Sequence, residues 1–226
     1  MAQTMDEALG SFATRIEEAE TLKVLGNDQF GKGAYAVAIN HYNDALHRLP
    51  LRASKECQDE DQDASTTEAE TKVDHAQATV IQSLRIKLQS NLAASYLKLE
   101  HYDECVRAAS EVLAEEPTNV KALHRRATAH EALGGWSHLS SAKKDLEELQ
   151  RLEQQGLVPA SYRSELQASL SRIQPKLEQA GEKEKEEMLG KLKNVGNQFL
   201  GLFGLSTDNF QLQQQDGGGY SINFKQ

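Results

Sequence analysis

The sequence predicts an all-α protein of stacked helical hairpins followed by a long helix. Three observations support this fold class. Apolar residues recur three and four positions apart, which is the spacing of one helix face. Glycine and proline interrupt this spacing where a tight turn or a helix end is expected. The same pattern of small and large residues then returns further along the chain, as expected of a protein built from repeats.

The clearest hairpin lies at residues 19–50. Its first helix carries apolar residues three and four apart and ends at the turn around Gly33. Its second helix ends before Pro50, because proline cannot donate the backbone hydrogen bond that continues a helix. We expect Gly26 and Ala38 to let the two helices pack closely, since both side chains are minimal.

This pattern returns twice. Tyr35 is followed at offsets of 3, 7, 10 and 15 by Ala38, Tyr42, Ala45 and Pro50, and Tyr102 is followed at the same offsets by Cys105, Ala109, Val112 and Pro117. A third copy opens at Gly134, and its Trp136 lies 34 residues after Tyr102, which is the period of a tetratricopeptide repeat. We therefore predict three tetratricopeptide hairpins, at about 19–52, 86–119 and 120–156, that stack into a right-handed α-solenoid within residues 19–153.

The third hairpin departs from the pattern. Leu139 stands where a small residue is expected. Three additional residues in the turn would bring Ala142, Leu146 and Leu149 onto the expected positions. We therefore predict a longer turn at Trp136 to Leu139.

An acidic segment separates the first two hairpins, since Tyr35 and Tyr102 are 67 residues apart, one period of 34 plus 33. Residues 54–74 hold eight acidic residues and two lysines. Such a segment buries too little apolar surface to offset its ordering entropy, so residues 53–78 are predicted to be a disordered insert. It is either a solvated spacer or an interaction or phosphorylation site at Ser65, Thr66 and Thr67.

The two ends of the chain fall outside the repeats. Residues 1–18 are predicted to be an N-terminal helical extension, and residues 157–200 a helical segment whose first part caps the stack. Pro175 should kink or restart this helix, and the part after about Glu184 is a solvated or partner-binding rod. Residues 201–226 form an extended glycine and aromatic tail that docks or binds a partner.

Composition limits the classes of function. The formal net charge of −9 disfavours nucleic acid and anionic membrane as general partners, although a small basic site remains compatible with it. Two cysteines form no disulfide framework, no run is apolar enough to span a membrane, and residues 1–18 do not resemble a signal peptide, so we expect a cytoplasmic protein. No HExxH or CxxC motif occurs among the seven histidines and two cysteines. We expect no cofactor, no metal and no enzymatic activity.

Polar residues on the first helix of each hairpin form the candidate site, because these helices line the inner surface of a hairpin stack. Lys23 and Asn27 are four residues apart and share a helix face, as do Lys121 and Arg125, and Asn91 holds the matching position of the second hairpin. Cations and amides without a carboxylate among them suit an extended anionic guest, such as a peptide that ends in a carboxylate. Any single lysine of this set could equally be a solvated surface residue.

The sequences around these residues carry a resemblance. LKVLGNDQF (22–30), SNLAASYLKL (90–99) and VKALHRRA (120–127) resemble the signatures of carboxylate-clamp tetratricopeptide domains, which are co-chaperone modules that bind the Glu-Glu-Val-Asp tails of cytosolic heat-shock chaperones. The resemblance implies that Lys23, Asn27 and Asn91 hold the terminal carboxylate. It implies that Lys121 binds the side chain of the last Asp and that Arg125 binds a backbone carbonyl or an upstream acid. The C-terminal sequence is similar to that of one member of this family, from which the acidic insert and the third turn depart.

The sequence thus predicts a non-enzymatic adaptor that binds the acidic C-terminal tails of chaperones of the heat-shock 70 and 90 classes. The alternative is a scaffold whose main partner is a non-chaperone client, bound by the C-terminal helix and the aromatic tail.

Overall fold

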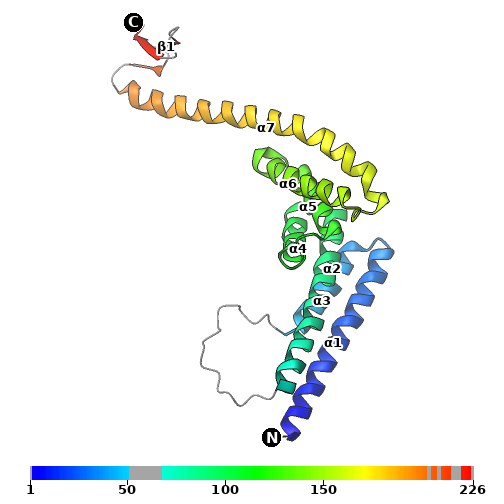
Figure 1. Cartoon of the computed structure of the whole chain (residues 1–226). Coiled ribbons are helices and arrows are strands. Elements are labelled where there is room, and N and C mark those ends of the chain that lie inside the picture. The colour runs from blue at the N-terminus through cyan, green and yellow to red at the C-terminus, as the bar shows by residue number, and fades with distance from the viewer. Residues whose placement is uncertain (1, 51–67, 203–204, 208–209, 215–219, 225–226) are drawn as a thin grey trace. The chain divides into compact units, whose positions relative to one another are not determined.

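The computed structural model describes residues 2–50, 68–202, 205–207, 210–214 and 220–224, and it describes side chains for 13–50, 77–202 and 205–207. Its helices are α1 (Ala2–Gly31), α2 (Tyr35–Arg48), α3 (Glu68–Lys98), α4 (Tyr102–Glu115), α5 (Val120–Leu133), α6 (Gly135–Gln154) and α7 (Ala160–Gly201). Two short strands, β1 (Phe210–Gln214) and β2 (Tyr220–Phe224), follow (Figure 1). The chain divides into two compact units, Met1–Ile173 and Gln174–Gln226.

The first unit is a stack of three helical hairpins, α1 with α2, α3 with α4, and α5 with α6. Each helix also contacts the next one along the chain, which joins the hairpins into one stack. The first helices of the hairpins contact one another directly, α1 with α3 and α3 with α5. The prediction of an all-α hairpin stack is therefore confirmed, and α1, α3 and α5 form one layer of it.

Small residues set the packing distance in the first hairpin, as predicted. A Cβ atom at Gly26 would lie 2.5 Å from Cε1 of the Tyr42 ring, so only glycine fits there. Ala38 and Ala45 are fully buried, and Tyr42 is 1% exposed. This contact places the tyrosine hydroxyl beside α1, where the candidate site begins.

Each hairpin turn needs one residue with positive φ two positions before the aromatic residue of the second helix. Gly33 and Gly134 hold that position in the first and third hairpins, with φ of 78° and 69°. The second hairpin has Glu100 there, with φ of 60°, which is the left-handed region that side chains other than glycine disfavour. The second turn is therefore strained where the other two are not.

The predicted long turn at Trp136 to Leu139 is wrong. Helix α6 begins at Gly135, and Gly134 and Gly135 close the turn with positive φ at both positions. Leu139 is buried within the helix, as is Ala142 one turn later. The hairpin accommodates a large residue at the expected small position, so no additional turn residues are needed.

Helix α3 is longer than the second hairpin requires. It begins at Glu68, so the last part of the predicted insert, residues 68–78, is helical. Residues 51–67, including Ser65, Thr66 and Thr67, lie outside the described residues. The side chain of Arg85 donates to the carbonyl oxygen of Pro50, which fixes the point where the chain leaves the first hairpin.

Helix α7 belongs to both units. Leu166, Ser169 and Ile173 of its first part are buried, as expected of a helix that covers the last apolar face of a hairpin stack. Pro175 lies inside this helix, which continues to Gly201 without the predicted restart. Within the described residues, no helix has an apolar stretch long enough to cross a membrane.

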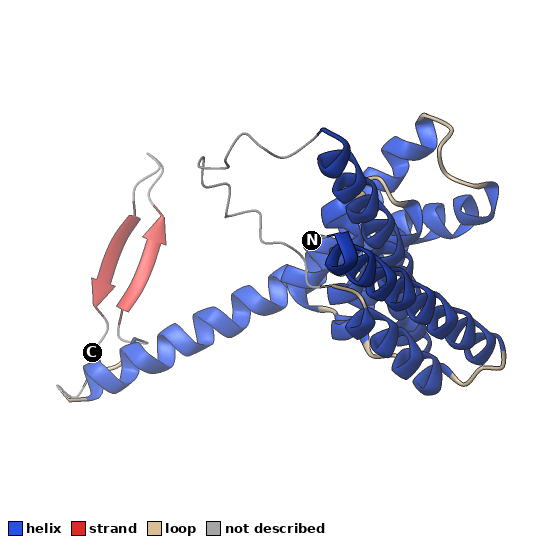
Figure 2. Ribbon diagram, turned by 90° about the horizontal axis from the view of Figure 1, so that it is seen from below, coloured by secondary structure: helices blue, strands red, loops and turns tan. Residues whose placement is uncertain are grey.

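The tail contains an antiparallel strand pair, which the prediction of an extended tail did not specify. Strands β1 and β2 pair with Leu212 opposite Ile222, and Figure 2 shows them side by side. The period-two alternation of Tyr220, Ile222 and Phe224 falls within β2. This two-stranded pair is the sheet that the described residues of the second unit form.

Candidate functional site

All five predicted site residues lie on the layer formed by α1, α3 and α5. Lys23 and Asn27 lie on α1, Asn91 lies on α3, and Lys121 and Arg125 lie on α5. Because α3 contacts both neighbours, residues far apart in the sequence come together here. The structure links the site through two pairs of side chains, one between α1 and α3 and one between α3 and α5.

The two amides form the first link. Nδ2 of Asn91 donates to Oδ1 of Asn27 at 2.8 Å, and the hydroxyl of Tyr42 donates to the same oxygen at 2.8 Å. Burial raises the pKa of the Tyr42 phenol, so it stays a neutral donor at physiological pH. Two donors on one oxygen fix the orientation of the Asn27 amide, and its Nδ2 group is then available to donate to a guest.

Arg125 forms the second link. Its Nη1 donates to the carbonyl oxygen of Ser90 at 2.9 Å and to the Ser90 hydroxyl at 2.8 Å. Burial lowers the pKa of the Arg125 guanidinium, which nevertheless stays charged at neutral pH. The residue that holds Arg125 directly precedes Asn91, so one stretch of α3 contacts both ends of the site.

The two lysines differ in their surroundings. Nζ of Lys23 lies 3.5 Å from the carboxylate of Glu20, one turn earlier on α1, and its side chain is 18% exposed. The expectation that no carboxylate lies among the cations is therefore wrong for Lys23. Lys121 is exposed at the start of α5, where Asn119 caps the helix by accepting from the backbone N–H of Ala122 at 3.0 Å.

Sequence reasoning missed the supporting residues of this site. Tyr42 was assigned to packing only, although its hydroxyl holds Asn27. Ser90 is not predicted, because its residue type does not indicate that it holds Arg125. The fact that Ser90 directly precedes a predicted site residue is the only available signal.

The start of α7 contacts α5 next to a site residue. Nε2 of His124 lies 3.1 Å from the carboxylate of Glu165, and the His124 ring meets the edge of the Tyr162 ring at a centroid distance of 5.0 Å. His124 precedes Arg125 directly on α5. The capping part of α7 therefore contacts the helix that carries two of the site residues.

Behind α5 lies a buried polar cluster. Arg126 donates to both carboxylate oxygens of Asp145, at 2.8 and 2.7 Å, and to the hydroxyl of Ser110. Nδ1 of His130 lies 3.0 Å from Nδ1 of His138. These contacts join α4, α5 and α6 and stabilise the stack behind the site.

Other polar features of the described residues offer weaker candidates. Burial raises the pKa of the Cys105 thiol to about 11, so this cysteine is unreactive. No group of three or more His, Cys, Asp or Glu side chains in the described part of the chain is arranged to hold a metal ion. Neither observation indicates a catalytic centre.

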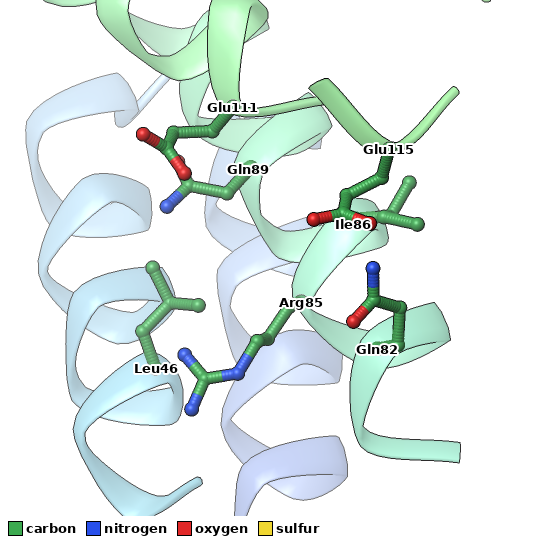
Figure 3. A pocket seen from close by; sticks show the side chains of 7 residues that line it. All are labelled: Leu46, Gln82, Arg85, Ile86, Gln89, Glu111 and Glu115. Atoms are coloured by element: carbon green, nitrogen blue, oxygen red, sulfur yellow. The ribbon is translucent and has the colours of Figure 1, made fainter. Parts of the chain in front are cut away.

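A hollow of about 80 Å³ lies on the other side of α3 (Figure 3). Its lining comes from α2, α3 and α4 and consists of Leu46, Gln82, Arg85, Ile86, Gln89, Glu111 and Glu115. The volume is that of a few water molecules. It is lined by none of the five site residues.

Comparison with known proteins identifies the fold. The C-terminal tetratricopeptide domain of an FK506-binding protein of Plasmodium falciparum superposes with a TM-score of 0.56 and 23% identity, covering 76% of this chain and 95% of that one. The chain therefore has a tetratricopeptide-repeat fold. The first such domain of Spaghetti (RPAP3), solved with the HSP90 peptide SRMEEVD, is 23% identical with a TM-score of 0.47, and covers 72% of this chain and 97% of that one.

Sequence relatives match about half of this chain. Mitochondrial import receptor subunit TOM34 of Rattus norvegicus is 31% identical over 121 residues, which are 54% of this chain and 31% of that protein. Outer envelope protein 61 of Arabidopsis thaliana is 29% identical over 123 residues, which are 54% of this chain and 18% of that protein. The chain thus spans less than a third of the length of these relatives. No protein-family model matches it.

Proposed function

We propose that the chain is a non-enzymatic cytoplasmic adaptor that binds the acidic C-terminal tails of heat-shock chaperones of the 70 and 90 classes. The guest would be an extended peptide that ends in Glu-Glu-Val-Asp. Lys23, Asn27 and Asn91 would hold its terminal carboxylate, Lys121 the side chain of the last Asp, and Arg125 a backbone carbonyl or an upstream acid.

The observation that carries this proposal is the hydrogen bond between Asn27 and Asn91. It brings two helices of one layer together through the amides predicted to bind the carboxylate. With the Asn27 oxygen accepting from both Asn91 and Tyr42, N–H groups remain on both amides to donate to an anion. Donors that are already oriented lose little entropy on binding, which favours affinity.

The cations complete the argument. Lys23 is partly screened by Glu20, but the side chain of Glu20 is 57% exposed, so the pair contributes only about 0–1 kcal/mol and a guest carboxylate can displace Glu20. Arg125 is held in place by Ser90 before any guest arrives. The affinity should be micromolar, because a pentapeptide buries little surface and must be ordered, and it should fall as salt is added.

Calorimetric titration of the full chain tests the proposal. A free-acid Glu-Glu-Val-Asp peptide should bind, and the C-terminally amidated peptide should bind far more weakly. Lys23→Ala or Arg125→Ala should each cost about 2 kcal/mol or more of binding free energy through lost charged hydrogen bonds. Lys32→Ala and Arg107→Ala are matched controls, because both side chains are highly exposed and pair with Asp28 and Glu104, which are not site residues. Equal affinity for the free-acid and amidated peptides would refute the clamp.

The hydroxyl of Tyr42, which holds the Asn27 amide, can be tested separately. Tyr42→Phe removes one of the two donors to Asn27 while it keeps the buried ring. Peptide affinity should fall about fivefold, and Glu20→Gln should raise it slightly by freeing Lys23. Unchanged affinity of Tyr42→Phe would show that the Asn27 amide needs no such support.

The C-terminal sequence carries the finer resemblance. EEMLGKLKNVGNQFLGLFGLSTDNFQLQ and GGYSINF are similar to the C-terminus of tetratricopeptide repeat protein 1, and we infer that the chain resembles that protein over about residues 19–224. The alternative function, a scaffold for a non-chaperone client, is favoured by the exposed apolar side chains of α7. Deletion of residues 185–226 and the Lys23/Arg125 double variant separate the two functions in a pull-down.

A further inference from the structure

The C-terminal part of α7 carries an apolar face that is exposed in the structure. Six large apolar side chains within fifteen residues are between 56% and 79% exposed. They are Met188, Leu189, Leu192, Val195, Phe199 and Leu202. Successive residues of an α-helix are about 100° apart, so the five of these that lie within α7 cover an arc of about 120° on one side of the helix. Leu202 follows directly after the helix.

The charges of this stretch are placed at the borders of the apolar face. Lys191 falls just beyond one edge of the arc and Lys193 just beyond the other. No Asp or Glu occurs between Glu187 and Asp208, although the whole chain has a net charge of −9. The opposite side of the helix carries only uncharged residues, such as Asn194 and Gln198.

The chain that follows α7 packs back on the helix through Thr207, at one edge of this face, where a Cβ atom at Gly196 would lie 3.1 Å from Cγ2 of Thr207. Oδ1 of Asn197 accepts from the backbone N–H of Thr207 at 2.6 Å and from the Thr207 hydroxyl at 2.7 Å. Asn197 lies on the side of the helix opposite Val195 and Phe199. The turn after α7 is therefore anchored away from the centre of the apolar face.

We propose that residues 188–202, which are the last turns of α7 and the residue that follows it, bind the surface of an anionic lipid membrane, with the helix lying in the plane of the interface. Apolar side chains enter the boundary of the acyl chains, and lysines at both borders extend toward lipid headgroups. A helix of fifteen residues is about 22 Å long, which is too short to span a bilayer but sufficient to lie along its surface.

The charge pattern favours a membrane over the other occupants of such a face. A second copy of this stretch would bring lysine borders together, and residues 188–207 contain no Asp or Glu that could offset their repulsion. A protein groove would need acidic groups along both of its rims. An anionic lipid surface supplies negative charge on both sides of an embedded helix in any orientation.

Flotation of the full chain with lipid vesicles tests the proposal. The chain should float with vesicles of phosphatidylcholine mixed with phosphatidylserine and much less with phosphatidylcholine alone, and added salt should weaken the binding. Leu192→Gln with Phe199→Gln should abolish flotation. Lys191→Gln and Lys193→Gln should each lower the partition coefficient about fivefold, and the corresponding arginine variants should restore it.

The matched control exchanges two residues on the polar side of the same helix, Asn194→Gln with Gln198→Asn, and should float like the unmodified chain. Absence of flotation with mixed vesicles overturns the proposal and returns the face to a protein partner. The proposal is also overturned if the chain forms a concentration-dependent dimer in the absence of lipid and the double substitution Leu192→Gln with Phe199→Gln abolishes that dimer. The clamp is tested separately, because Lys23→Ala should leave flotation unchanged and the α7 variants should leave peptide affinity unchanged.

Discussion

The two units of the chain differ in what covers their apolar side chains. In the first unit, stacking buries the apolar side chains of the core, and even Ile173 near the end of the capping segment is 2% exposed, although Val24 and Leu157 stay exposed. In the second unit, the same helix continues with Leu192 67% exposed. Both stretches are amphipathic by sequence, so amphipathicity alone does not indicate whether a helix is covered by its own chain.

This difference separates the kinds of contact that each unit can make. Stacking in the first unit uses the apolar faces and leaves the polar side chains of α1, α3 and α5 for recognition. The second unit has no further layer over its apolar face among the described residues, so recognition there depends on apolar contact. Substitutions of apolar residues should therefore change stability in the first unit and binding in the second.

The largest effect on stability is expected at the buried ion pair. Asp145→Asn removes the charge that faces Arg126, and the side chain of Asp145 is only 7% exposed. The free energy of unfolding should fall by about 3 kcal/mol, because Arg126 then remains without its charged partner. Urea unfolding followed by the fluorescence of Trp136, the only tryptophan, measures this.

Two controls sharpen this prediction. Glu147→Gln breaks an exposed pair with Lys143 on the same helix and should cost less than about 0.5 kcal/mol. Leu192→Gln in the second unit should cost equally little. A loss at Leu192 as large as at Asp145 would show that the exposed face of α7 contributes to folding.

The next effect is expected where the first hairpin is most tightly packed. Gly26→Ala places a Cβ atom 2.5 Å from the Tyr42 ring, and the resulting strain should lower the free energy of unfolding by about 2 kcal/mol. Displacement of the ring should also weaken peptide binding through Asn27. Gly31→Ala is the control, since a Cβ atom there meets nothing within 4 Å and alanine favours a helix. Equal stability of the two variants would contradict this account.

The hairpin stack was predictable because a repeat imposes the same burial at the same offsets. Gly26, Ala38 and Cys105 occupy positions whose required size follows from the spacing alone. The turn before α6 was not predictable in this way, because a stack can accept Leu139 at a small position if its neighbours adjust. Local composition likewise did not indicate that α3 begins as early as Glu68.

The residues of the candidate site were predictable, but the contacts between them were not. Lys23, Asn27, Asn91, Lys121 and Arg125 follow from their helix positions, and their role in peptide binding stays a prediction. The contact of Asn27 with Asn91 joins residues 64 positions apart, and such contacts depend on how helices stack. The exposed face of α7 shows the same limit, since its pattern does not indicate whether anything covers it.

A smaller effect is expected at the strained turn of the second hairpin. Glu100→Gly should raise the free energy of unfolding by about 1 kcal/mol, because glycine adopts the positive φ of this position without strain. The reverse change at the matching position, Gly33→Ala, should lower it by a similar amount, since a Cβ atom there meets no neighbour and only the backbone is strained. Thermal unfolding measures both, and a stabilising Gly33→Ala would contradict the role of these turns.

The smallest effect concerns pH and again separates the units. Burial lowers the pKa of His130 below its ordinary value of 6.5, although Asp145 and Asp103 oppose this, while His138 and Arg126 add to it. The unfolded chain therefore takes up this proton more readily, so the contribution of His130 to stability should be constant above about pH 6.5 and fall as the pH drops below it. His130→Gln should flatten this part of the profile of unfolding free energy against pH. Residues 174–226 contain no histidine, so vesicle binding should not follow the same profile. A stability that rises on acidification through this range would contradict the assignment to His130.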